Sequence, residues 1–257
     1  MLKAAQPLLL DFENVTVLRG GRTALQSLTL KIPVGEHTVL FGPNGSGKST
    51  FIKTITRECY PVAGPRTAFR IFGEENWNVF DLRQLLGIVT NDLEAGLDHD
   101  MTGREAVLTG FFSHLRRWPD ERVTPAMQRK VREVLAILEV AHLADRPLGE
   151  MSSGEVRRML IGRALVHDPK ALILDEPTNS LDLRAAFEFR RSLARIAALD
   201  KTIIIVTHQV EDVIPEIRRV VLLRRGRLFK DGPPARVLTA RNLSALFGMR
   251  ISLPPFL

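Results

Sequence analysis

Cysteine is almost absent from this chain: of its 257 residues, only Cys59 carries a thiol. An internal disulfide is therefore excluded, and with it the disulfide framework on which small secreted domains depend. Long hydrophobic runs are also missing. The longest, such as residues 203–206 and 220–223, fall far short of the ~20 apolar residues that span a bilayer. The sequence therefore predicts no membrane-spanning segment.

A secretory signal and long blocks of one charge are missing as well. Residues 1–10 hold one lysine and a short apolar run without a small-residue cleavage site, so we expect a cytoplasmic protein. Lysine and arginine outnumber aspartate and glutamate by 36 to 29, but no five or six like charges stand together. The pI near 10.1 fits attraction to nucleic acid or to an anionic membrane. The same pI is equally compatible with arginines that lie on solvated faces and around phosphates.

The pattern along the chain predicts an α/β fold. Alternating hydrophobic residues in 8–17 and 25–32, separated by Gly20-Gly21, predict an N-terminal antiparallel β-subdomain. Further on, predicted strands alternate with predicted helices, which is typical of a mainly parallel sheet. The strands are expected at 37–41, 68–72, 171–174, 202–206, 220–223 and 227–230, and the helices at 48–58 and 183–199, with two short helices at the end.

Residues 92–150 differ from the rest because strand-like runs disappear. Helical spacing in 104–115 and 126–140, with a short turn near Leu143, predicts an inserted helical subdomain. The chain contains no internal repeat. We therefore expect a single domain over 1–257, with the helical subdomain at 92–150 inside it.

Residues 42–50 read GPNGSGKST and fit the phosphate-loop pattern G-x-x-x-x-G-K-[ST], with a predicted strand before it and a helix after it. Backbone N–H groups of such a loop surround phosphate oxygens, Lys48 reaches the β- and γ-phosphates, and the Ser49 hydroxyl is placed for Mg²⁺. The alternative is a glycine-rich turn with a surface lysine. The predicted ATP-binding residues are Gly42, Pro43, Asn44, Gly45, Ser46, Gly47, Lys48, Ser49 and Thr50.

A second motif, ALILDEP, begins at Ala171 and places two carboxylates after four apolar residues. Such a run suits a parallel strand buried on both faces, whose carboxyl end faces the ligand in open α/β sheets. We expect Asp175 to meet the Mg²⁺ through water and Glu176 to deprotonate the attacking water. His208 follows the strand at 202–206 and could reach the γ-phosphate. Both motifs could instead be plain turn residues.

Residues 151–155, MSSGE, precede a predicted helix. Ser152 and Glu155 have the spacing of a capping box, and a serine-capped helix start is also an anion site, so both interpretations hold together. The whole order is phosphate loop, helical region, SSGE helix, LILDEP strand, Ser180-Leu181-Asp182 and then Thr207-His208. This set, which covers nearly the whole chain, resembles the ABC ATPases.

The resemblance implies a role for each matching residue. Glu176 corresponds to the catalytic base, His208 to the switch histidine and Asp182 to the carboxylate that joins two sites. The segment that contacts the γ-phosphate of ATP bound to the other subunit corresponds to Ser152, Ser153, Gly154 and Glu155. The stretches EAVLTGFF (105–112), THQVE (207–211) and VLT (237–239) are most similar to bacterial cassettes for molybdate or iron-complex uptake.

Three positions depart from the family pattern. Arg19 stands where an aromatic residue usually covers adenine, and a guanidinium also stacks but with weaker base discrimination. Asn91 stands where a glutamine usually approaches Mg²⁺ and the attacking water, and its side chain is one methylene shorter. In the signature, Met151 and Ser153 replace leucine and glycine, which is tolerable where the backbone φ at Ser153 stays negative.

Three functions are compatible with these motifs. The first is an energy-coupling subunit that forms a homodimer around two ATP and drives transmembrane permease subunits from the inner face of the membrane. In it, the residues after Asn91 and those at 110–118, including Trp118, would receive a short helix of the permease. The second is a soluble ABC ATPase acting on nucleic acid, the ribosome or a cytosolic assembly. The third, a P-loop GTPase or kinase, lacks any N-K-x-D pattern here and leaves the SSGE helix unexplained.

Overall fold

The computed structural model describes residues 6–112, 114–116 and 122–252. The chain forms two compact units. The first comprises the residues up to Asp81 together with those from Thr202 onward, and the second comprises Leu82–Lys201. Within the described residues, no helix is both long enough and apolar enough to cross a membrane.

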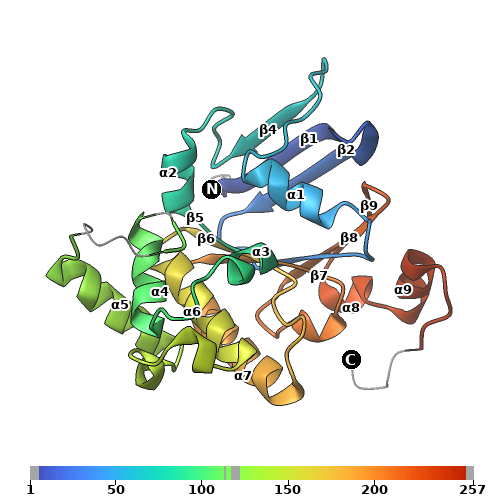
Figure 1. Cartoon of the computed structure of the whole chain (residues 1–257). Coiled ribbons are helices and arrows are strands. Elements are labelled where there is room, and N and C mark those ends of the chain that lie inside the picture. Colours follow the sequence, from blue (N-terminus) through green and yellow to red (C-terminus); the bar gives the residue numbers. More distant parts are fainter. Residues whose placement is uncertain (1–5, 113, 117–121, 253–257) are drawn as a thin grey trace, which may run out of the picture. The chain divides into compact units, whose positions relative to one another are not determined.

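The first unit contains a three-stranded antiparallel sheet with the order β2-β1-β4, built from β1 (Leu8–Arg19), β2 (Arg22–Pro33) and β4 (Ala68–Ile71). Gly20 (φ 55°) and Gly21 (φ 73°) make the turn between β1 and β2, because this backbone region is open to glycine at little steric cost. The predicted antiparallel β-subdomain is confirmed. Helix α1 (Lys48–Ile55) packs on β1 through Phe51, whose ring stacks on Phe12 at 5.1 Å (Figure 1).

The parallel strands of the first unit position its functional loops. Strand β3 (Thr38–Phe41) pairs in parallel with β7 (Thr202–Thr207) on one side and with β8 (Arg219–Arg224) on the other, while β9 (Arg227–Gly232) runs antiparallel to β8. Strands β3 and β7 are buried along their whole length, as their continuous apolar sequence predicts. The short elements η4 (Val210–Asp212), α8 (Pro234–Val237) and α9 (Ala240–Phe247) complete this unit.

The second unit contains another parallel pair, β5 (Leu86–Val89) and β6 (Ala171–Asp175). Helix α2 (Val79–Leu85), which begins in the first unit and ends in the second, leads directly into β5, and neither element was expected from the sequence. Together with the parallel pairs of the first unit, this pair confirms a mainly parallel sheet. Helices α6 (Ser153–Leu165) and α7 (Leu183–Ala197) pack against each other, and α6 also packs on β5.

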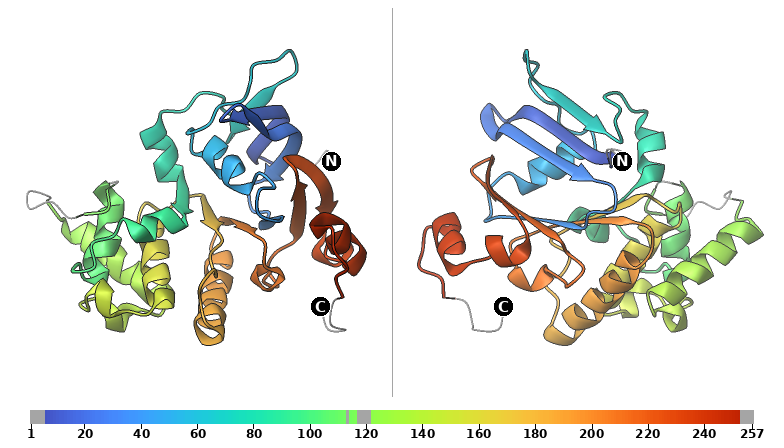
Figure 2. Two further views of the ribbon diagram at one scale, coloured as in Figure 1. Left: turned by 45° about the vertical axis from the view of Figure 1, so that its right-hand side comes forward. Right: turned by 180° about the vertical axis from the view of Figure 1, so that it is seen from behind.

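In the described part of 92–150 the regular elements are all helical, apart from one isolated β-bridge between Thr102 and Pro147, and the left view of Figure 2 shows these green helices gathered with α6 in one cluster. Where one helix was predicted over 104–115, α4 ends early and a 3-10 turn follows. Gly110 of this turn packs so closely on α6 that a Cβ there would collide with the Arg163 carbonyl. The elements are α3 (Asn91–Ala95), α4 (Gly103–Leu108), η1 (Thr109–Phe112), α5 (Pro125–Ile137), η2 (Ala141–Leu143) and η3 (Leu148–Glu150).

Candidate active site

The phosphate loop leaves the end of β3 and runs into α1, as the motif predicts. The Gly42 N–H donates to the Thr207 carbonyl at 3.1 Å, which ties the start of the loop to the end of β7. Two glycines give the loop its path: Gly45 has φ 76°, and Gly47, the residue before α1, has φ 109°. A Cβ on Gly47 would lie 2.7 Å from the Ala24 carbonyl. Side chains at these positions would therefore distort the loop.

The polar groups of this loop fit a phosphate ligand. Lys48 is only 6% exposed, and its ammonium donates to the carbonyls of Gly42 (2.7 Å) and Pro43 (3.3 Å), so the cation is held over the loop. The Ser46 hydroxyl is buried and makes no hydrogen bond to any described residue. Burial of an unsatisfied hydroxyl is costly, and a phosphate oxygen would satisfy it. The remaining loop residues are Asn44 and Ser49, which are exposed, and Thr50, which is buried.

A second segment supports the loop from the side, and sequence reasoning missed it. The N–H of Gly226, in the turn between β8 and β9, donates to the Ser46 carbonyl at 2.8 Å. The Gly226 carbonyl accepts from the Gln26 N–H of β2 at the same distance. Gly226 has φ 75°, and a Cβ there would lie 2.5 Å from the Ala24 carbonyl. The turn glycine therefore fastens the phosphate loop to β2.

His208 lies beside the phosphate loop because their two strands are neighbours. Phe41, the last residue of β3, is the register partner of Thr207, the last residue of β7. The next residues, Gly42 and His208, therefore leave the same edge of the first unit. His208 is half-buried. The structure thus brings together these two predicted site elements.

Arg19 is exposed at the end of β1, opposite Arg22 across the Gly20-Gly21 turn. The neighbouring Leu18 is 51% exposed. A planar guanidinium in this open position is free to lie flat on a ring. Its stacking on adenine stays a prediction.

The predicted acidic motif closes β6 in the second unit. Asp175 is the last residue of β6, and Glu176 follows in the left-handed region at φ 47°, with its carbonyl accepting from the Asn179 N–H at 3.1 Å. Leu174 is the register partner of Val89 in β5, so the segment after β5 leaves the same edge as the two acids. That segment contains Asn91, the first residue of α3, whose side chain lies outside the described part of the chain.

The SSGE segment forms the start of α6 and contains the expected capping box. The Ser152 hydroxyl accepts from the Glu155 N–H at 3.4 Å, and the Glu155 carboxylate accepts from the Ser152 N–H at 2.7 Å. Burial tends to raise the pKa of Glu155, but hydrogen bonds from Ser152 and the charges of Arg146 and Arg158 outweigh it and leave the pKa lowered. The carboxylate is therefore ionised at neutral pH.

The surface of this helix start remains open. Ser152 and Ser153 are exposed, and Ser153 keeps a negative φ, as the family substitution requires. Gly154 is buried against α7, and a Cβ there would lie only 2.8 Å from the Ala185 Cβ, so glycine fits this contact best. Asp182, which was predicted to join two sites, caps α7 by accepting from the Ala185 N–H at 2.7 Å.

Arg157, which the sequence did not single out, connects α6 to α3. Its side chain is 6% exposed, and one guanidinium nitrogen lies 3.1 Å from the Glu94 carboxylate of α3. Burial lowers the pKa of Arg157, while the charges of Glu94 and Asp175 act in the opposite direction. The charge of Arg157 on α6 is therefore influenced by carboxylates of both α3 and β6.

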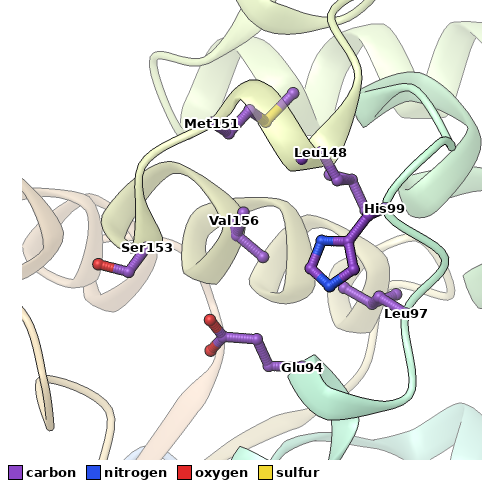
Figure 3. Close-up of a pocket in the computed structure, with 8 residues that line it drawn as sticks. Glu94, Leu97, His99, Leu148, Met151, Ser153 and Val156 are labelled. Carbon is purple, nitrogen blue, oxygen red and sulfur yellow. The ribbon is translucent and has the colours of Figure 1, made fainter.

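A pocket of about 200 Å³ lies next to this ion pair. Figure 3 shows the Glu94 carboxylate extending from α3 toward the start of α6, with the His99 ring from the following segment beside it. The pocket combines one acid, one imidazole and one hydroxyl with an apolar lining. It is lined by Glu94, Leu97, His99, Leu148, Gly149, Met151, Ser153 and Val156.

The aromatic segment at 110–118 is only partly described. The Phe111 ring packs edge-on against His167 at 5.4 Å between ring centres, and the Phe112 ring stacks on His114 at 5.9 Å. Trp118, predicted to lie on the docking surface, lies outside the described residues, as do Ser113 and Arg117. The docking role of this segment stays a prediction.

The fold and these loops define a P-loop nucleoside triphosphatase of the α/β class. The family model described as "ABC transporter" matches residues 25–179. Together with the relatives below, this match shows that the chain belongs to the ABC transporter ATP-binding family. The chain is an ATP-binding cassette and an ATPase.

Relatives in this family share most of the chain. It is 33% identical over 232 residues to the cobalt import ATP-binding protein CbiO of Rhodobacter capsulatus, covering 90% of this chain and 80% of that protein. It is 34% identical over 226 residues to the Nod factor export ATP-binding protein I of Burkholderia orbicola, covering 88% of this chain and 71% of the relative. The structure of cbiO1 from Clostridium perfringens, part of the ABC transporter complex cbiONQ, superposes with a TM-score of 0.80 at 27% identity, covering 93% of this chain and 94% of that one.

Proposed function

We propose that two copies of this chain close around two ATP molecules and power transport through membrane-embedded permease subunits. The observation that carries this proposal is the open start of α6, where Ser152 and Ser153 are exposed. One chain thus offers two helix starts suited to anions, α1 behind its phosphate loop and α6. The phosphate-binding site formed by the loop of one copy can be completed by the start of α6 in the other copy.

In this proposal the phosphate loop and Lys48 hold the nucleotide phosphates, and Arg19 covers the base. Glu176 takes a proton from the attacking water, His208 contacts the γ-phosphate, and Asn91 helps to orient the water. Ser152, Ser153, Gly154 and Glu155 contact the ATP of the partner copy, with Asp182 between the two sites.

Magnesium would act as the charge-neutralising ion on the phosphates. No group of three His, Cys, Asp or Glu side chains that could hold a metal is present among the described residues. Hard oxygen donors suit Mg²⁺, which keeps several waters and binds through few protein ligands together with substrate phosphates. We propose the Ser49 hydroxyl and the Asp175 carboxylate as the protein ligands, with Asn91 near them.

The partner subunit is proposed to dock at the pocket beside α3. Its lining begins three residues after Asn91, with Glu94, Leu97 and His99, which is the region where the resemblance expects a permease helix. The cbiO1 relative is described as part of a transporter complex, which supports a membrane-associated role at the inner face. Import and export relatives are both similar to this chain, so direction is left open.

The experiment that tests this proposal uses Glu176→Gln. The amide keeps the shape of the side chain but cannot accept the proton of the water, so hydrolysis should fall by ~10²–10⁴ while ATP binding stays. ATP should then convert monomers of this variant to dimers in light scattering. A variant that stays monomeric at saturating ATP, or that keeps more than about a tenth of the wild-type rate, contradicts the proposal.

The alternative function, action on nucleic acid, is suggested by the pI near 10.1. Several arginines are already engaged in ion pairs within the fold, among them Arg70, Arg104 and Arg219. These arginines could contact nucleic-acid phosphates only by giving up their carboxylate partners. Binding to labelled DNA or RNA that survives physiological salt would favour this alternative, since non-specific phosphate contacts weaken steeply with salt.

A further inference from the structure

We infer that Asp212 is a positioning residue for His208 and acts through the Thr207 hydroxyl. This inference rests on the proposed role of His208 in hydrolysis and adds a residue that lies outside the motifs. Asp212 lies four residues after His208, at the end of η4.

One hydroxyl connects both neighbours of His208 to this acid. The Thr207 hydroxyl donates to the Asp212 carboxylate at 2.5 Å. The same hydroxyl oxygen accepts from the Gln209 N–H at 3.0 Å. The residues immediately before and after His208 are therefore held by the same group, which leaves the His208 backbone little freedom to turn.

Burial argues that the carboxylate is more than a turn residue. Asp212 is 1% exposed and Thr207 is fully buried. A buried carboxylate is costly unless hydrogen bonds compensate it, and a 3-10 turn closes through its backbone alone, as the Asp212 N–H bond to the Gln209 carbonyl (3.3 Å) shows. The carboxylate therefore makes a bond to Thr207 that the turn itself does not require.

Thr207 also sets the distance between His208 and the phosphate loop. Its carbonyl accepts the Gly42 N–H at 3.1 Å, and Gly42 is the first residue of the loop. The backbone of Thr207 fastens the loop, and its side chain fastens the His208 segment. Asp212 therefore controls the orientation of His208 toward the site of the phosphates, where a misplacement of about 1 Å can cost ~10² in rate.

The test is a double-mutant cycle on ATP hydrolysis with purified full-length protein. We expect Asp212→Ala and Thr207→Val each to lower kcat by roughly tenfold to a hundredfold, with KM for ATP nearly unchanged. Thr207→Ser keeps the hydroxyl and should restore most of kcat. In the His208→Ala background, Asp212→Ala should cause no further loss, because its effect passes through the histidine.

The control is Thr38→Val. Thr38 is as fully buried as Thr207, but it lies at the start of β3, away from the phosphate loop, and its hydroxyl donates to the Glu36 carbonyl at 3.0 Å. This variant should therefore lower Tm and leave kcat unchanged. If Asp212→Ala does not fold, Asp212→Asn and Thr207→Val complete the cycle. If Asp212→Ala lowers kcat equally in the wild-type and His208→Ala backgrounds, the inference is wrong. It is also wrong if the Asp212 and Thr207 variants keep a wild-type kcat. Either result leaves the proposed role of His208 standing. A wild-type kcat for His208→Ala overturns the role of His208 and the inference with it.

Discussion

Single residues outside the phosphate-loop motif decide how that loop is held. Gly226 donates to the Ser46 carbonyl and accepts from Gln26, so three segments meet at one turn residue. No side chain fits there, because of both the positive φ and the nearby Ala24 carbonyl. The loop is thus preorganised by a residue 180 positions away from Ser46 along the chain.

We predict that Gly226→Ala weakens ATP binding. The new Cβ would press on the Ala24 carbonyl and displace the turn that holds Ser46. Gly73→Ala is the matched control: Gly73 also has a positive φ (85°), but a Cβ there would meet nothing within 4 Å. Both variants should lose about 1 kcal/mol of stability from the positive φ alone, and Gly226→Ala should lose more because of its clash, as chemical denaturation would show. Only Gly226→Ala should raise the ATP dissociation constant; equal constants for both variants would contradict this prediction.

Arg19 offers a second prediction at this scale. If its guanidinium stacks on adenine, Arg19→Ala should weaken ATP binding by ~0.5–2 kcal/mol, a small loss beside the phosphate contacts. Arg19→Tyr should restore or improve affinity, since a ring gives a larger stacking face. Titration calorimetry with ATP and GTP would measure both. An unchanged ATP affinity in Arg19→Ala, with ATP and GTP already bound differently by the wild type, would refute stacking by Arg19.

At the scale of secondary-structure elements, the start of α6 carries two roles that a mutation usually confounds. Ser152 caps the helix and is also proposed to contact the partner's ATP. The chain provides its own control, because Thr102 and Glu105 form the same capping box at the start of α4. Both boxes lie in the second unit.

We predict that Ser152→Ala and Thr102→Ala lose similar stability, about 1 kcal/mol each, since each removes one side-chain cap. Only Ser152→Ala should also lose ATP-driven dimerisation and hydrolysis. Thermal denaturation and steady-state phosphate release would be measured on both proteins. Parallel losses of hydrolysis in the two variants would mean that Ser152 serves only as a cap.

Most elements were predictable because their apolar spacing is regular, but α2 and β5 were not. Strand β5 has only four residues, LGIV, and one is a glycine, which weakens any strand pattern. Gly87 is required by tertiary packing, since a Cβ there would lie 2.9 Å from the Ala164 carbonyl of α6. A contact between segments so distant in sequence leaves no local signal.

The same reason separates the predicted from the unpredicted parts of the site. The phosphate loop, the acids at the end of β6 and the SSGE cap are short local patterns with known physical roles, so the sequence reveals them. Gly226, Asp212 and Arg157 act through contacts with other segments, and each looks like an ordinary turn or helix residue in the sequence. Only the structure shows which groups they touch.

At the scale of the whole molecule, transport requires that a docked partner alter the ATPase reaction. The second unit offers a route, because Glu94 lines the pocket of Figure 3 and also pairs with Arg157 of α6 at 3.1 Å. Arg157 in turn feels the charge of Asp175. A permease segment seated in the pocket would contact Glu94 directly, and a shift of Glu94 would act on the signature helix.

We predict that Glu94→Gln keeps most of the basal ATPase activity and loses stimulation by the permease. The amide still fits the pocket and can accept a hydrogen bond from Arg157, so the fold should persist, but the charge that couples α3 to α6 is gone. The measurement compares ATPase rates of the cassette alone and of the cassette reconstituted with its permease in lipid vesicles. Glu133→Gln, which removes an exposed ion pair with Lys130 on α5, is the control and should keep both rates, because exposed pairs contribute only ~0–1 kcal/mol. Full stimulation of Glu94→Gln would show that the partner's signal reaches the site by another route, and a collapse of its basal rate would show that Glu94 serves the fold instead of the coupling.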